Sequence, residues 1–162
     1  MPAGYAKIGL HMVFDIKLGE NFRHKARLVA GGHKTTVDPV LTFSSVVSRD
    51  SVRILFLVAA LNDLDVKSCD IQNAYITADN REKRYVIAGP EFGSDKGKVF
   101  IVRKALYGLK SAGGAFWGLL RQHLGQEGMN FVPSKADPDV WMRPNVKKDG
   151  TQYYEYIACC HW

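Results

Sequence analysis

Most strand-like stretches of this sequence come in neighbouring pairs, and helix-like stretches separate the pairs. The first pair, 11–17 and 22–30, is rich in β-branched and aromatic residues and flanks the polar turn 18–21, so it predicts a β-hairpin. Two further hairpins are predicted within 85–102 and 140–159. Hairpins and helices in mixed order, without a regular β-α-β repeat, indicate an α+β fold.

Two helices are predicted between the hairpins. The first has Asp50 or Ser51 as its N-cap and runs to about Asn62. Arg53 is the only charged residue inside it, and a helix that is apolar on nearly all sides is expected to be buried. The second helix spans 112–126, where each glycine costs about 1 kcal/mol, so packing must hold it. Its apolar face comprises Phe116, Leu119, Leu120 and Leu124.

The bulk composition is that of a globular protein with one core. A chain of 162 residues suffices for one domain, and no linker divides it. The net charge of +6 permits an anionic partner such as nucleic acid without requiring one. Cys69, Cys159 and Cys160 lack the spacing of a disulfide framework or zinc site and suit a reducing, intracellular compartment. The longest apolar run, 54–61, is too short to span a membrane.

The stretch 68–75, Ser-Cys-Asp-Ile-Gln-Asn-Ala-Tyr, carries the most informative polar residues. Asp70 ends a predicted short strand, 66–70, and its apolar flanks require it to be solvated, paired or metal-bound. On the pattern alone, a strand-terminal aspartate that caps the next turn is the favoured interpretation. Residues 73–77 are expected to be extended. Asp70 and Tyr75 would then point to opposite faces, unless the polar pair Gln72 and Asn73 turns the chain.

Two other stretches can contact phosphates. Gly108 allows close approach of the backbone and Lys110 can reach a phosphate, although the spacing of a Walker loop is absent. Strand alternation places Arg23, Lys25 and Arg27 on one face of the first hairpin, which forms a basic stripe. An ordinary solvated hairpin face explains this stripe equally well.

Six stretches, taken in order along the chain, form a more specific pattern. They are KARLVAGG at 25–32, TFSSVV at 42–47, SVRIL at 51–55, CDIQNAY at 69–75, ALYGLK at 105–110 and ADPDV at 136–140. Together they resemble the reverse transcriptase of copia-type LTR retrotransposons, and the resemblance extends from about residue 11 to residue 156.

The resemblance implies an RNA-directed DNA polymerase with a right-hand fold. Residues 1–162 would be one fragment of its reverse transcriptase domain, without thumb or RNase H. Fingers would span about 1–50 and 77–110, and a partial palm about 51–76 and 111–162. The implied partners are an RNA template, a DNA primer, a dNTP and the rest of the polyprotein, including integrase. The implied location is a cytoplasmic retroelement particle.

The resemblance also implies roles for single residues. Asp70 matches the first catalytic aspartate, a ligand of one of two Mg²⁺ ions, and the backbone carbonyl of Ile71 completes the metal shell. The backbone amides of Asn73 and Ala74 approach the triphosphate. Tyr75 packs against the incoming sugar and rejects a 2′-hydroxyl by its bulk.

Further matched residues surround the nucleotide and the template. Lys25 and Arg27 match the basic fingers hairpin that grips the triphosphate of the dNTP, and the pattern leaves open which of the two makes the contact. Tyr107 and Gly108 match the segment beside the nucleotide and the template. Arg23 and Lys110 are expected to contact nucleic acid.

Two departures from the family pattern stand out. Residues 111–114 replace a Gln-Ala-Pro-Arg-like run, so the template contact there is in doubt. The family's palm strand leads from an aromatic stretch like 153–156 into a Tyr-x-Asp-Asp turn, whereas residues 159–162 resemble no family pattern. We therefore expect the chain alone to be catalytically incomplete. The alternatives are a non-catalytic nucleic-acid-binding remnant and a poorly folding pseudogene product.

Overall fold

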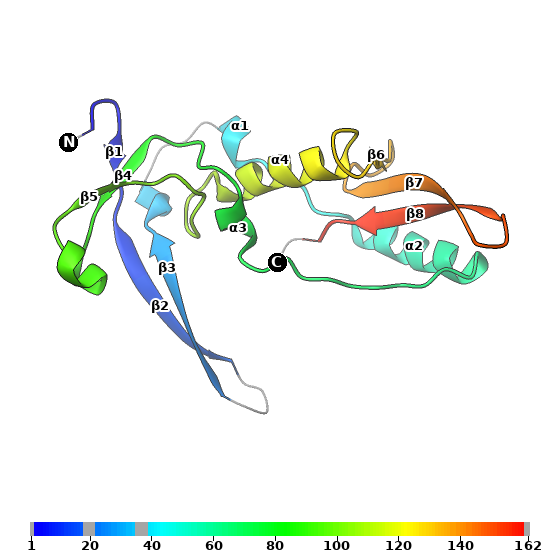
Figure 1. Ribbon diagram of the computed structural model, residues 1–162, viewed down its shortest axis with the longest axis horizontal. Helices are drawn as coiled ribbons and strands as arrows, with labels where there is room; N and C mark the ends of the chain where they lie inside the picture. Colours follow the sequence, from blue (N-terminus) through cyan, green and yellow to red (C-terminus); the bar gives the residue numbers. More distant parts are fainter. Residues whose placement is uncertain (1, 18–21, 35–38, 161–162) are drawn as a thin grey trace. The chain divides into compact units, whose positions relative to one another are not determined.

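The chain has a mixed α+β fold, as its sequence predicts (Figure 1). The computed structural model describes residues 2–17, 22–34 and 39–160, apart from the side chains of Lys17, Arg23 and Lys34. The chain divides into two compact units. Unit 1 comprises Met1–Phe43 and Gln72–Phe116, and unit 2 comprises Ser44–Ile71 and Trp117–Trp162. Within the described residues, no helix is long and apolar enough to cross a membrane.

Unit 1 contains the predicted first hairpin. β2 (Leu10–Lys17) pairs antiparallel with β3 (Arg23–Ala30) over the whole length of both strands. The predicted turn between them, 18–21, lies outside the described residues. Because side chains alternate along a strand, one face of β2 presents apolar groups, of which Phe14 is 76% exposed. The β2–β3 ladder is therefore fixed by backbone pairing and by its attachment at the Ala30 end.

A second sheet in unit 1 has the strand order β1-β4-β5. β1 (Ala6–Lys7) runs parallel to β4 (Arg84–Ile87), and β4 pairs antiparallel with β5 (Val99–Ile101). The predicted hairpin within 85–102 is thus confirmed, and its connection includes the 3₁₀ helix η2 (Pro90–Asp95). Two short helical turns, η1 (Gly32–Lys34) and α1 (Pro39–Thr42), also belong to unit 1, as do α3 (Ala74–Thr77) and the start of α4 (Ala112–Leu124).

The end of the β2–β3 hairpin is joined to the loop that precedes α4. The backbone N–H of Ala30 donates to the carbonyl of Tyr107 at 2.7 Å. Gly108 has φ +87°, and a Cβ there would collide with the carbonyl oxygen of Ala30. A Cβ at Gly32 would collide in turn with the carbonyl oxygen of Gly108. Only glycine permits so close an approach with a left-handed backbone.

Unit 2 is built on a sheet of order β6-β7-β8. β7 (Val140–Val146) and β8 (Gln152–Ala158) form the predicted last hairpin, and β6 (Val132–Pro133) pairs with the start of β7. α4 (Ala112–Leu124) starts where predicted and ends two residues early. The core of unit 2 comprises Leu124, Phe131, Trp141 and Cys159, with Leu120 and Ile157 packed against it.

Two tryptophans of unit 2 share one cation. The guanidinium of Arg121 lies 4.5 Å from the ring centre of Trp117 and 5.4 Å from that of Trp141. The indole N–H of Trp117 donates to the buried carboxylate of Asp139 at 3.1 Å. These contacts anchor α4 to β7.

The helix α2 (Arg49–Leu61) departs from the prediction in two respects. Its N-cap is Ser48, whose hydroxyl oxygen accepts from the N–H of Ser51, so neither Asp50 nor Ser51 caps it. The predicted burial is also wrong, because no residue of α2 is buried. The largely exposed apolar residues of this helix are Ile54, Phe56, Leu57 and Leu61. An apolar pattern shows which residues of a helix can be buried. How many of them are buried depends on the elements that pack against the helix.

The segment between α2 and α3 (Ala74–Thr77) also differs from its prediction. Residues 64–71 have no regular secondary structure, so the predicted strand 66–70 is wrong. A strand needs a hydrogen-bonded neighbour, and the ladders of the described residues do not include this segment. The expected extended segment 73–77 is wrong as well, because α3 occupies it. The predicted turn is confirmed: Asn73 has φ +55° and directly precedes α3.

Asp137 anchors the N-terminus of α2 within unit 2. Its Oδ2 accepts from the N–H of Ser48 at 3.0 Å and from the hydroxyl of Ser51 at 2.6 Å. Its Oδ1 accepts from the N–H of Asp139 at 3.1 Å. These donors, with the Ser51 hydroxyl first, hold the pKa of Asp137 below its ordinary value.

We expect Asp137→Asn to lower the free energy of unfolding by about 1–2 kcal/mol at pH 7, because an amide accepts these bonds less strongly. A lowered pKa gives stability above the unfolded value of about 4, which is lost as the pH falls through the folded pKa. The difference between wild type and variant should therefore shrink as the pH falls below about 4. Urea titrations followed by circular dichroism from pH 7 to pH 3 measure it. Asp65→Asn, at an exposed position of the same unit, is the control.

We expect Gly108→Ala to be much more destabilising than Gly97→Ala. Both glycines lie in unit 1 with nearly equal dihedral angles, φ +87° and φ +84°. Open space surrounds the position that a Cβ would take at Gly97, so alanine there costs only the left-handed backbone, about 1–2 kcal/mol. At Gly108 the collision with Ala30 should add at least about 2 kcal/mol. Equal losses in urea titrations of the two variants would contradict the close approach.

Candidate functional site

The rings of two predicted site residues contact each other in unit 1. The ring centres of Tyr75 and Tyr107 lie 4.8 Å apart with an interplanar angle of 50°. Phe116 of α4 meets Tyr75 edge-on at 6.3 Å. Rings at these distances and angles attract one another and restrict each other's rotation. We call Tyr75 and Tyr107 the aromatic pair.

Local backbone geometry positions Tyr75. The left-handed residue Asn73 turns the chain, and α3 begins at Ala74, so Tyr75 is the second residue of one helical turn. The carbonyl of Asn73 accepts from the N–H of Ile76 at 3.1 Å, and that of Tyr75 accepts from the N–H of Ala78 at 3.0 Å. Asparagine tolerates the left-handed conformation better than most residues, which explains its place there.

Tyr107 is carried by the turn segment, which we define as residues 106–112. Within it, the N–H of Leu109 donates to Leu106 and the N–H of Ala112 donates to Leu109, at 3.1 and 3.2 Å. Leu109 is buried, whereas Lys110 is exposed. The turn segment therefore has an apolar anchor and presents Lys110 on the surface of unit 1.

The basic stripe of the hairpin includes an acid that the sequence reasoning missed. In the β2–β3 register Lys25 lies opposite Asp15, and Arg27 Nη1 lies 4.0 Å from Asp15 Oδ2. All three side chains are therefore on one face of the hairpin. Strand alternation combined with the hairpin register could have found Asp15. Arg23 belongs to β3, and its side chain lies outside the described residues.

Asp70 and Ile71 belong to unit 2, and both are exposed. They lie in the segment without regular secondary structure. Asp70 is therefore solvated, which is one of the three environments expected from its sequence, and no cost of burying a lone carboxylate arises.

The residues present do not form a magnesium site by themselves. The carboxylate of Asp70 is the hard oxygen donor that Mg²⁺ prefers. In the part of the chain that the structure describes, however, no group of three or more His, Cys, Asp or Glu side chains could hold a metal ion. Burial, together with the nearby Asp139 and Cys160, raises the pKa of the Cys159 thiol to about 11, so this thiol stays protonated. Proteins usually bind Mg²⁺ through one or two carboxylates together with substrate phosphates and water, so Asp70 by itself supplies only part of such a ligand set.

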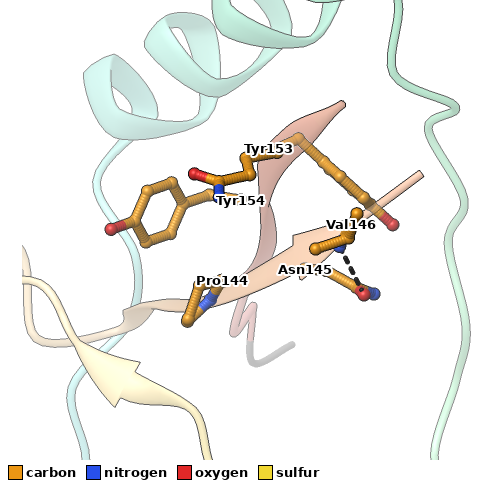
Figure 2. Close-up of a pocket in the computed structure, with 6 residues that line it drawn as sticks. Pro144, Asn145, Val146, Tyr153 and Tyr154 are labelled. Atoms are coloured by element: carbon orange, nitrogen blue, oxygen red, sulfur yellow. Dashed lines mark hydrogen bonds between the residues drawn. The ribbon is translucent and has the colours of Figure 1, made fainter. Parts of the chain in front are cut away.

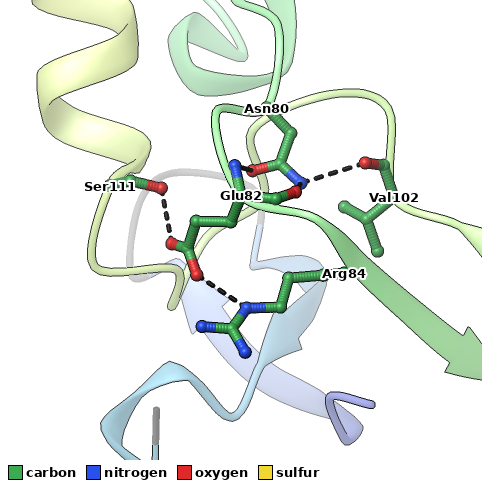
Figure 3. A network of polar contacts seen from close by, with 5 residues as sticks. All are labelled: Asn80, Glu82, Arg84, Val102 and Ser111. Atoms are coloured by element: carbon green, nitrogen blue, oxygen red, sulfur yellow. Dashed lines mark hydrogen bonds and ion pairs between the residues drawn. The ribbon is translucent and has the colours of Figure 1, made fainter. Parts of the chain in front are cut away.

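A buried polar cluster in unit 1 was not found from the sequence. Figure 3 shows Glu82 between Arg84 of β4 and Ser111, the residue before α4, with Asn80 beside it. The run Arg-Glu-Lys-Arg at 81–84 resembles a solvated charged stretch, and no periodicity singles out Glu82. Yet the Glu82 side chain is only 4% exposed.

A hollow of about 580 Å³ lies on the β7–β8 hairpin of unit 2 (Figure 2). Its lining residues are Pro144, Asn145, Val146, Gln152, Tyr153 and Tyr154. None of them is a predicted site residue or carries a charge. The hollow is therefore separate from the chemistry that the sequence indicates.

Comparison with known proteins agrees with the motifs. The family model described as reverse transcriptase (RNA-dependent DNA polymerase) matches residues 1–149. No solved structure matches the chain significantly.

Three curated relatives are retrovirus-related Pol polyproteins of plant transposons. Those from transposons RE1 and RE2 of Arabidopsis thaliana are 34% and 33% identical over 149 residues, which cover 87% of this chain. That from transposon TNT 1-94 of Nicotiana tabacum is 29% identical over 150 residues, or 88% of the chain. The chain spans only 10–11% of the length of these relatives. The match over residues 1–149 and the two relatives above 30% identity show that the chain belongs to the reverse transcriptase (RNA-dependent DNA polymerase) family.

Proposed function

We propose that the chain supplies the nucleotide-binding part of an RNA-directed DNA polymerase of a copia-type retrotransposon. In this proposal residues 1–50 and 77–110 act as the fingers and residues 51–76 and 111–162 as part of the palm of a right-hand polymerase. The observation that carries it is the aromatic pair. Tyr75 and Tyr107 come from two separate family motifs, and their rings meet at 4.8 Å in one unit.

The aromatic pair suits discrimination between sugars. A ring that is packed against Tyr107 on one side and Phe116 on another cannot swing away from an added hydroxyl. Rejection of a 2′-hydroxyl then arises from a clash rather than from an attractive contact. In the proposal, the backbone at Asn73 and Ala74 lies along the triphosphate, and Gly108 lets the turn segment approach the nucleotide closely.

The charged residues of the hairpin suit the phosphates. Lys25 and Arg27 share one face, so both can approach the same anion. Asp15 on that face offsets part of their charge, and an exposed ion pair of this kind is weak enough to open for a phosphate. In the proposal Arg23 and Lys110 contact the RNA template or the DNA primer, and the binding weakens with salt.

The proposal assigns Asp70 one part of a metal site that needs further carboxylates. Two neighbouring divalent cations repel each other, and several anionic ligands are required to hold them. Asp70 and the carbonyl of Ile71 do not meet that requirement. We therefore propose that the 162 residues bind nucleotide and nucleic acid but do not polymerise DNA without carboxylates from another chain or segment.

We expect no primer extension by the purified chain. The measurement is incorporation of labelled dNTP on an RNA template with a DNA primer and Mg²⁺, beside a reverse transcriptase known to be active. Binding of the same template-primer at low salt, lost as salt is raised, would agree with the proposal. Robust extension would contradict the assignment of an incomplete metal site, and no binding at low salt would contradict a nucleic-acid role.

We expect Tyr75→Ala to reduce the preference for dNTP over rNTP about tenfold, because the excluding ring is lost. Tyr75→Phe should retain the preference, since it keeps the ring and loses only the hydroxyl. Fluorescent dNTP and rNTP analogues titrated with Mg²⁺ into each variant give the ratio of the two dissociation constants. Tyr154→Ala, at an exposed tyrosine of unit 2, is the control. A ratio that is unchanged in Tyr75→Ala would contradict the assigned role.

A further inference from the structure

We propose that Glu82 is the positioning residue for the turn segment of unit 1, and through it for the ring of Tyr107 in the aromatic pair. The geometric part of this inference concerns unit 1 alone. Its consequence for nucleotide binding rests on the proposed function.

The carboxylate of Glu82 is enclosed by two donors from different elements (Figure 3). Its Oε1 accepts from the hydroxyl of Ser111 at 2.5 Å, and its Oε2 accepts from Nε of Arg84 at 2.8 Å. Ser111 is 1% exposed, and the side chains of Glu82 and Arg84 are 4% and 12% exposed. Water therefore has little access to the group, and its bonds depend on these partners.

Stability alone is a weak reason for this arrangement. Moving a carboxylate and a guanidinium out of water costs free energy that their mutual attraction often does no more than offset. Such a pair does restrict the relative positions of the two side chains, because charged hydrogen bonds form only over a narrow range of geometries. The geometric consequence of the Glu82 contacts is therefore more informative than their strength.

The backbone of Glu82 is itself held in place. The Oδ1 of Asn80 accepts from the N–H of Glu82 at 3.0 Å. The amide group of Asn80 donates to the carbonyls of Glu82 and Val102, at 2.6 and 2.9 Å. One asparagine thus links the Glu82 backbone to Val102, which follows β5 on the way to the turn segment.

The segment that carries Glu82 holds both ends of the turn segment. At the near end, the N–H of Ala105 donates to the carbonyl of Ala78 at 3.0 Å, and Lys104 Nζ lies 2.8 Å from Asp79 Oδ1. At the far end, Ser111 bonds to Glu82. Residues 78–84 therefore fix the two points between which Tyr107 and Lys110 lie.

The same segment follows α3 directly, and α3 carries Tyr75. Both rings of the aromatic pair are thus attached to residues 78–84, one through the chain and the other through the turn segment. The contact of Glu82 with Ser111 is the side-chain link that closes this loop. If it opens, the turn segment keeps its near anchor and its bond to Ala30 but loses this side-chain bond at its far end.

Glu82→Gln tests the link with little change in volume. A glutamine with its oxygen towards Arg84 can still donate from its NH₂ group to the Ser111 hydroxyl, so the bond to a charged carboxylate is replaced by a weaker neutral one. Ser111→Ala removes only the hydroxyl and is the second variant. Glu155→Gln is the matched control in unit 2, because Glu155 accepts in the same way from Arg143 and Asn145 on the β7–β8 hairpin.

The first measurement is amide hydrogen exchange in full-length chains. We expect the protection of the Leu109 and Ala112 amides to fall about tenfold in Ser111→Ala, which loses one hydrogen bond to a charged group, and by a smaller factor in Glu82→Gln, which keeps a neutral one. Glu155→Gln should leave both amides unchanged. Unchanged protection in both unit 1 variants would overturn the inference.

The second measurement is the ratio of dissociation constants for the fluorescent dNTP and rNTP analogues. In Ser111→Ala the ratio should fall several-fold, and in Glu82→Gln by less, since a displaced Tyr107 no longer supports Tyr75. A purely structural role would lower the melting temperature and leave the ratio unchanged, and that outcome would overturn the link to the site. If the wild-type chain binds no dNTP, the proposed function fails, and the exchange measurement alone decides whether Glu82 positions the turn.

Discussion

The close approach of two backbones, at Ala30 and Gly108, is the constraint on which unit 1 depends. A two-stranded hairpin has little stability of its own in water, since most of its side chains stay exposed. The β2–β3 hairpin gains a fixed base because the Ala30 amide bonds to Tyr107 while Gly108 lets the backbones meet. The same contact fixes the backbone position of Tyr107, so the hairpin and the aromatic pair are held by one backbone contact.

Much of the fold could be predicted from periodicity, because pairing partners that are close in sequence need little besides alternation and a turn. All three hairpins and both long helices occur near their predicted bounds. Long-range relations could not be predicted in that way. The segment 64–71 has strand-like residues and no strand, and α2 has the pattern of a core helix and no buried residue. In both cases neighbours decide the outcome, and a pattern within one segment does not specify its neighbours.

The candidate site shows the same division. The polar residue Asn73 indicates the turn that precedes α3 and Tyr75. The glycine at position 108 indicates that another backbone comes close there. Asp15 is visible only after the hairpin register is known. Glu82 is visible only in three dimensions, since a buried carboxylate inside a run of basic residues looks like surface until its partners are found. The family resemblance supplied the matches for Asp70 and Tyr75, and their roles remain predictions.

The tryptophans offer a consequence for experiments on the two units. Every tryptophan of the chain belongs to unit 2, and Trp117 and Trp141 both lie against Arg121. Tryptophan fluorescence, excited at the long-wavelength edge of protein absorption, therefore reports on unit 2 almost alone. Backbone circular dichroism reports on both units. One sample, observed with both signals during a denaturant titration, reveals whether the units lose structure together or in sequence.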